Sequence, residues 1–156
     1  MNFQVIAISP EIARQARETM KSPQYGHPAH ADLARGYGPC RSCLRTFEID
    51  KEIRILFTYN AFAELSSLPL PSPIFIHQND CKRYEANKFP SDLRSLPTIL
   101  EGYGNESWLV SRETVANEDF EGVITRIFAD AAVRYIHIRN AEAGCFIARI
   151  ERLEKH

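Results

Sequence analysis

Two short cysteine motifs constrain how this chain can fold. Cys40 and Cys43 are separated by two residues, and His77 and Cys81 are separated by three. A tight turn can direct each pair at one tetrahedral metal ion, and three thiolates with one imidazole suit zinc. Because 33 residues lie between Cys43 and His77, the pairs can meet only if the strand around Pro73 lies beside the first turn. The spacing predicts a closed, structural zinc site formed by Cys40, Cys43, His77 and Cys81.

The same residues also fit two other interpretations. Cys43 could be a small buried hydrophobic residue, and His77 could hydrogen-bond to backbone at the end of a strand. Cys40 and Cys43 could instead form a redox dithiol. The reactive thiol of such a dithiol lies at a helix N-terminus, whereas residues 44–55 alternate like a strand. That context weakens the redox interpretation.

Secondary structure of both kinds is expected in the first half of the chain. Residues 3–8 and 53–59 have the apolar patterns of strands. A helix is predicted to follow Ser9, a good capping residue, with Pro10 at its first position. Residues 21–39 contain three prolines, three glycines and two histidines, which predicts a long loop.

The second half is predicted to hold most of the strands and one further helix. The helix begins near Asn117, which can cap it. Its apolar stripe would face the core and consists of Phe120, Val123, Ile124, Ile127, Phe128 and Ala131. Strands are predicted at residues 73–77, 98–103, 107–111, 133–139 and 145–153. Because the chain lacks a regular βαβ alternation, we expect an α+β fold with a largely antiparallel sheet and two main helices.

The last two predicted strands suggest a second candidate site. A simple hairpin register places Arg139 opposite Cys145 and His137 opposite Ile147, with the apolar residues on the other face. Arginine beside cysteine favours the thiolate, and a nearby histidine could act as a general base. Cys145, His137 and Arg139 are therefore candidate catalytic residues. The alternative is an amphipathic hairpin whose polar face meets solvent.

Length, composition and charge limit the class of protein. The 156 residues fit a single domain over 1–156, and 44% hydrophobic residues can form a core. The 19 basic and 20 acidic residues give a net charge of −1, which argues against a nucleic-acid partner. The longest uncharged stretch, residues 65–79, is too short and too rich in proline to cross a membrane. The N-terminus has no basic region ahead of its apolar residues, so no signal peptide is predicted.

Several segments of the chain resemble the bacterial domain of unknown function 1203 family. They are residues 39–44 (PCRSCL), residues 73–77 with Cys81 and Tyr84, and residues 135–141 with 144–150. The resemblance spans most of the chain and implies a small, intracellular, single-domain bacterial protein. It implies no activity and no catalytic residues. Arg139 stands where the family pattern has a second histidine, which argues against a metal bound by two strand histidines and leaves His137 and Cys145 as matching positions.

Together these features predict a small bacterial protein of the cytoplasm, in the form of a zinc-stabilised binding or regulatory domain. Its partner would be an unidentified small molecule or protein, and it would bind neither nucleic acid nor membrane. The alternative is a thiol-dependent enzyme or redox protein that uses Cys145 with His137, or Cys40 with Cys43.

Overall fold

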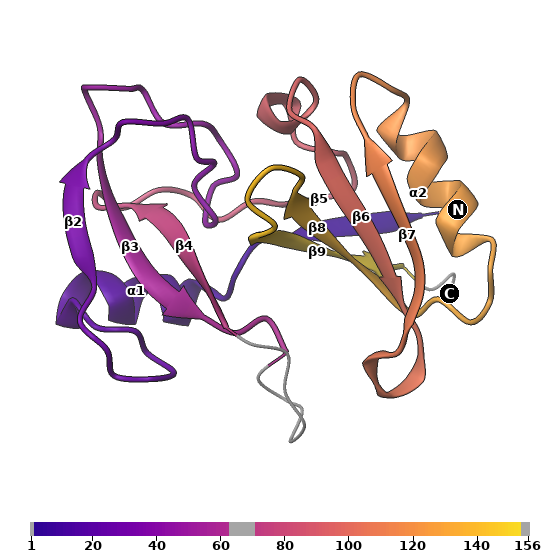
Figure 1. Cartoon of the computed structure of the whole chain (residues 1–156), viewed down its shortest axis with the longest axis horizontal. Helices are drawn as coiled ribbons and strands as arrows, with labels where there is room; N and C mark the ends of the chain where they lie inside the picture. Colours follow the sequence, from indigo (N-terminus) through magenta and orange to yellow (C-terminus); the bar gives the residue numbers. More distant parts are fainter. Residues whose placement is uncertain (1, 63–70, 154–156) are drawn as a thin grey trace. The chain divides into compact units, whose positions relative to one another are not determined.

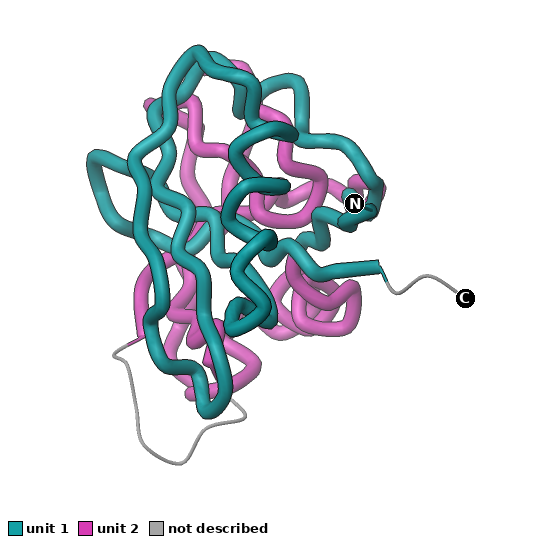
Figure 2. The backbone as a smooth tube through the Cα atoms, turned by 90° about the vertical axis from the view of Figure 1, so that its right-hand side faces the viewer, with its two compact units in different colours: residues 1–7, 84–156 teal, residues 8–83 magenta. Residues whose placement is uncertain are grey.

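The computed structural model of the protein describes residues 2–62 and 71–153. The chain divides into two compact units, drawn in different colours in Figure 2. The terminal unit comprises Met1–Ala7 with Tyr84–His156, and the inserted unit comprises Ile8–Arg83. The described residues form two α-helices and nine strands, and all strand pairs are antiparallel. The predicted α+β fold with a largely antiparallel sheet is confirmed, while the single domain over 1–156 stays a prediction.

In the inserted unit, helix α1 (Pro10–Thr19) begins where the sequence predicts. The Ser9 hydroxyl accepts a hydrogen bond from the backbone N–H of Glu11 at 3.2 Å. That bond satisfies one of the amide donors left open at a helix start. Ala13 and Ala16 are buried, and these small side chains face the inside of the unit.

A three-stranded sheet in the order β2-β3-β4 completes the inserted unit (Figure 1). Its strands are β2 (His30–Leu33), β3 (Ile53–Tyr59) and β4 (Ser72–His77). The strands predicted at 53–59 and 73–77 are confirmed. The prediction of an unbroken loop over 21–39 is wrong, because β2 lies within it and pairs with β3. Strand β2 has only four residues, and all of them are exposed, so it lacks a buried apolar face of the kind that marks the longer strands.

The pairing of β3 with β4 fixes the end of β4 beside the first cysteine turn. The buried side chains of Ile55 and Ile76 are direct partners across the two strands. The backbone N–H of Arg41 donates to Phe75 O at 2.9 Å. The turn around Arg41 therefore hydrogen-bonds to β4. The two cysteine motifs can form one site only if this turn and this strand are neighbours.

The terminal unit is a six-stranded sheet in the order β5-β1-β9-β8-β6-β7, with helix α2 against it (Figure 1). The predicted hairpin strands at 98–103 and 107–111 correspond to β6 and β7. The elements are β1 (Phe3–Ile6), β5 (Glu85–Ala86), β6 (Thr98–Tyr103), β7 (Leu109–Val115), α2 (Phe120–Phe128), β8 (Tyr135–Asn140) and β9 (Phe146–Arg152), with short 3-10 turns at Ser91–Leu93 and Asn105–Ser107.

Helix α2 starts later and ends earlier than its sequence pattern predicts. Its cap is Asp119, whose carboxylate accepts from the N–H of Gly122 at 3.1 Å, whereas Asn117 takes a left-handed backbone conformation. The helix ends at Phe128, so Ala131 lies beyond it and is exposed. The predicted residues that lie within the helix are all buried, namely Phe120, Val123, Ile124, Ile127 and Phe128.

The C-terminal hairpin forms, but its predicted register is wrong. Arg139 pairs with Phe146 rather than with Cys145, and His137 pairs with Arg149 rather than with Ile147. A bulge at Arg139 adds a residue to one side of the ladder, which a simple register does not contain. In the pairs from Tyr135 to Ile138, each partner on β9 lies two residues further along the chain than predicted. A shift of two keeps these side chains on their predicted faces. Phe146 is the exception, because beyond the bulge it pairs with Arg139 and its ring contacts that of His137.

The inserted unit starts and ends next to two paired strands of the terminal unit. Strands β1 and β5 are antiparallel neighbours, and the N–H of Ala7 donates to Tyr84 O at 3.1 Å. Within the inserted unit, Arg83 Nε donates to Ile8 O at 3.0 Å. In chain order, the whole inserted unit thus occupies the position of a hairpin loop between β1 and β5.

Neither helix in the described part of the chain is long and apolar enough to cross a membrane. Residues 65–70 of the uncharged, proline-rich stretch lie outside the described residues.

Candidate metal centre

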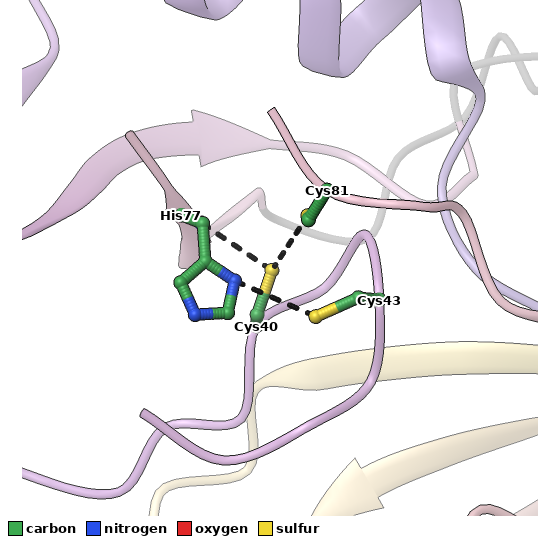
Figure 3. A group of neighbouring side chains, drawn as sticks. All are labelled: Cys40, Cys43, His77 and Cys81. Atoms are coloured by element: carbon green, nitrogen blue, oxygen red, sulfur yellow. Dashed lines mark hydrogen bonds between the residues drawn. The ribbon is translucent and has the colours of Figure 1, made fainter. Parts of the chain in front are cut away.

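Cys40 and Cys43 lie in a tight turn that its own backbone closes. The N–H of Cys40 donates to Arg45 O at 2.9 Å, and the N–H of Leu44 donates to Cys40 O at 2.8 Å. Leu44 follows the second cysteine with a left-handed backbone (φ 59°), a conformation that bulky residues rarely adopt. Backbone strain of this kind persists where the surrounding contacts impose it, often at functional sites. The turn carries both thiols toward the end of β4 (Figure 3).

His77 is the last residue of β4, and Cys81 follows four residues later. The backbone N–H of His77 donates to Cys40 Sγ at 3.3 Å. The strand end and the turn are therefore joined directly through one of the sulfur atoms.

The four predicted ligands converge (Figure 3). Cys40 Sγ lies 3.9 Å from Cys81 Sγ, and Cys43 Sγ lies 3.4 Å from His77 Nδ1. All four ligand atoms lie within 4.8 Å of one another. A tetrahedral zinc ion with Zn–S bonds of about 2.3 Å requires sulfur atoms roughly 3.8 Å apart. The separations fit a shared metal ion, and the prediction that these residues come together is confirmed.

The histidine is oriented by a carboxylate that the sequence reasoning missed. His77 Nε2 lies 2.8 Å from Glu52 Oε2, and the other carboxylate oxygen accepts from the N–H of Glu48 at 2.8 Å. The Glu52 charge beside Nε2 favours a proton on that nitrogen and leaves the Nδ1 lone pair for the site. A carboxylate in this position is the usual support for a metal-ligating histidine. Antiparallel pairing of strands 53–59 and 73–77 could have located Glu52. Such pairing brings the start of the first strand, which Glu52 precedes, close to His77 at the end of the second.

Contacts within the cluster shift the pKa values of three of the candidate ligands. Hydrogen bonds from Cys40 and Cys81 hold the pKa of Cys43 well below its usual range, despite burial. Burial is the main reason that the pKa of Cys40 is raised. The hydrogen bond to Cys43, followed by that to Cys81, raises the pKa of His77 to about 10. Metal binding would displace protons from these groups.

Two arginines outside the ligand set add positive charge at the sulfurs. Arg17 Nη2 donates to Cys81 Sγ at 3.3 Å, and Arg17 Nε donates to His77 O at 3.1 Å. The hydrogen bond to Cys43 raises the pKa of Arg45. Sequence reasoning missed Arg17, since it precedes Cys81 by 64 residues and belongs to a helix with several other charged residues.

Close packing around His77 depends on a glycine. The Phe47 ring lies edge-on to the His77 ring with centroids 4.6 Å apart. Gly38 has a left-handed φ of +90°, and a Cβ at this position would lie 2.5 Å from the Phe47 ring. A larger residue at Gly38 would therefore displace Phe47, the ring that packs against His77.

The residues of the second predicted site each contact other groups in the terminal unit, and their joint role stays a prediction. The Cys145 thiol donates to Ala143 O at 3.9 Å and lies just outside β9. Arg139 forms an ion pair with Glu101 and donates to Gly144 O at 3.2 Å. The arginine that was expected to stabilise a Cys145 thiolate is therefore directed at a carboxylate.

His137 lies in an aromatic environment instead of on a solvent-facing surface. It is 1% exposed, and its ring contacts those of Tyr103, Tyr135 and Phe146. Burial, followed by the charges of Arg139 and Arg149, lowers the pKa of His137 to about 3. Such a histidine stays neutral near pH 7 and is a weak base, so the predicted pairing with Cys145 gains no support from this geometry.

Comparison with known families gives one match. The model of a family described as a protein of unknown function (DUF1203) matches residues 37–152, a range that contains all four converging residues. No curated protein and no solved structure is significantly similar to the chain.

Proposed function

The chain belongs to the DUF1203 family of proteins of unknown function, and we propose that it is a binding or regulatory module stabilised by one structural zinc ion. The observation that carries this proposal is the convergence of Cys40, Cys43, His77 and Cys81, with all ligand atoms within 4.8 Å of one another. The bound partner would be a small molecule or another protein.

The chemistry of the ligands favours zinc over harder or larger cations. Three sulfurs and one imidazole nitrogen match the soft, tetrahedral preference of zinc, whereas magnesium and calcium require oxygen ligands. Four protein ligands leave no open position for a catalytic water, so the ion would be structural. The burial of Cys40, Cys43 and His77 supports the same role.

Elemental analysis tests the proposal directly. Protein purified without a metal-affinity tag should contain about one equivalent of zinc per chain. A strong chelator should remove the ion and lower the melting temperature, because binding energy for a structural ion is also folding energy. Much less than one equivalent of metal, together with a melting temperature unchanged by chelators, would sink the proposal.

Replacing Glu52 by glutamine should weaken zinc binding by about 10- to 100-fold, the usual effect of losing a residue that orients a ligand. The amide would retain an oxygen for the N–H of Glu48 but lose the charge beside His77 Nε2. Competition with a chromophoric chelator measures the change in affinity. Glu48→Gln is the matched control, since it removes an exposed charge nearby. Equal affinities for both variants would contradict the role of Glu52.

We also propose that the chain does not bind nucleic acid. Arg134, Arg149 and Arg152 do line one surface depression. However, Arg152 donates to the carbonyls of Phe128, Asp130 and Val133, and Arg149 lies 2.9 Å from the Glu151 carboxylate. Guanidinium groups that already form hydrogen bonds and ion pairs are less available to bind phosphates. Micromolar, salt-sensitive binding in mobility-shift assays with duplex DNA or structured RNA would overturn this proposal.

A further inference from the structure

We propose that Cys81 is a modification site at which hydroperoxides oxidise the metal centre, forming a disulfide with Cys40 and releasing the ion. This inference rests on the proposed zinc site and adds a chemical signal to which that site responds. Three features of the inserted unit support it: the access to Cys81, the arginine beside its sulfur, and the position of Cys40.

Access to the four ligands is unequal. Cys40 is 0% exposed, and Cys43 and His77 are each 6% exposed, whereas Cys81 is partly exposed. Cys81 also lines a cavity of about 410 Å³ against helix α1, and none of the other three ligands lines it. A small oxidant entering this cavity from solvent therefore meets Cys81 first.

The wall of the cavity holds a group suited to this reaction. Arg17 Nη2 lies 3.3 Å from Cys81 Sγ. Its guanidinium is held by His77 O at 3.1 Å and by the Asp80 carboxylate at 3.4 Å. A fixed guanidinium beside the thiolate can donate to a peroxide oxygen and stabilise the negative charge that develops as the O–O bond breaks. Arg17 would thus act as a catalytic residue in the oxidation.

The second sulfur is in place to complete the reaction. Cys40 Sγ lies 3.9 Å from Cys81 Sγ, so a modest shift brings the two sulfurs to bonding distance. In the first step the Cys81 thiolate attacks the peroxide, its O–O bond breaks, and a sulfenic acid and hydroxide or alkoxide form. In the second step the Cys40 thiolate attacks the Cys81 sulfur, an S–S bond forms, and hydroxide leaves. Two thiols lose two electrons in total, and the hydroperoxide is reduced to water or to an alcohol and water.

The oxidation would remove two of the four metal ligands. Cys43 and His77 alone form an incomplete site, and zinc binding weakens accordingly. Reduction of the disulfide by a dithiol would restore the ligands and allow the ion to bind again. The centre would thus release zinc reversibly in response to peroxide.

The experiment uses the full chain with its zinc content measured first. Hydrogen peroxide is added in stoichiometric amounts, zinc release is followed with a chromophoric chelator, and peptides are mapped under non-reducing conditions. We expect release of up to one zinc per chain, a disulfide between Cys40 and Cys81, and rebinding after reduction. Absence of zinc at the start would overturn both the proposed function and this inference. With zinc bound, a Cys40–Cys43 disulfide or resistance to peroxide until unfolding would overturn only the inference.

Two arginine variants separate a chemical role from a structural one. Arg17→Gln protein that is first loaded with one equivalent of zinc should release it at least about tenfold more slowly than the parent, because the donor beside Cys81 Sγ is lost. Arg14→Gln is the matched control, since Arg14 lines the same cavity but pairs with Glu11 and Glu18. Equal release rates for zinc-loaded Arg17→Gln and the parent would contradict the role of Arg17.

Discussion

A Cys43→Ser variant should be purified without stoichiometric zinc and should unfold at least about 10 °C below the parent protein. Cys43 Sγ lies 3.4 Å from His77 Nδ1 in the centre of the cluster. A serine hydroxyl is a poor ligand for zinc among thiolates. Structural zinc sites bind with about 10–16 kcal/mol in small domains, comparable with the whole net stability of a protein. Loss of even a fraction of this energy therefore shifts the melting temperature strongly.

Elemental analysis and thermal unfolding monitored by circular dichroism, with and without chelator, measure this effect. Cys145→Ser is the matched control, because Cys145 is a partly exposed thiol outside the cluster, and its Sγ donates to Ala143 O. This control should retain zinc and the melting temperature of the parent. A Cys43→Ser protein that melts with the parent would show that the cluster contributes little to stability.

Gly38→Ala should destabilise the protein by roughly 3 kcal/mol or more, from two independent costs. The left-handed φ of +90° at this position disfavours any side chain, and the new Cβ would lie 2.5 Å from the Phe47 ring. Because Phe47 packs against the imidazole of His77, displacing it should also lower zinc affinity. Urea unfolding and chelator competition report the two effects separately.

Gly26→Ala isolates the first of these costs. Gly26 belongs to the same unit and has a similar φ of +76°, but nothing lies within 4 Å of the Cβ that the substitution would add. This variant should lose only about 1–2 kcal/mol and should keep its zinc affinity. If the two alanine variants were equally stable and bound zinc equally well, contact with Phe47 would not be the reason that position 38 is glycine.

The convergence of the four candidate ligands was predictable because each half of the cluster is encoded locally. Cys40 with Cys43 and His77 with Cys81 each need only a turn to point two groups the same way, and spacing reports such turns. The meeting of the two halves depends on β3 pairing with β4, and both strands carry clear apolar patterns. The longer strands and the buried stripe of α2 were predictable for the same reason, since hydrophobic periodicity reflects burial.

The residues that surround the ligands were not predictable by the same means. Arg17 and Glu52 reach the site through tertiary packing, and nothing in their local sequence distinguishes them from other surface charges. Strand β2 is exposed throughout and is formed by hydrogen bonding to β3 rather than by an apolar pattern. The register of the last hairpin depends on a bulge at Arg139, an irregularity that a pairing pattern based on alternation cannot contain.

Because the inserted unit connects β1 with β5, the proposed zinc ion would also affect the assembly of the terminal unit, through chain entropy. Between these strands lie the 76 residues numbered 8 to 83. Bringing together the ends of a flexible segment of that length costs roughly 4 kcal/mol beyond a constant, since the cost grows with the logarithm of length. When the inserted unit is folded, its two ends are already held together, since Arg83 Nε donates to Ile8 O at 3.0 Å. Pairing of β1 with β5 then requires no further loop closure. A chain that cannot bind zinc would therefore have to close that segment unaided before Val5 and Ala86 could pair.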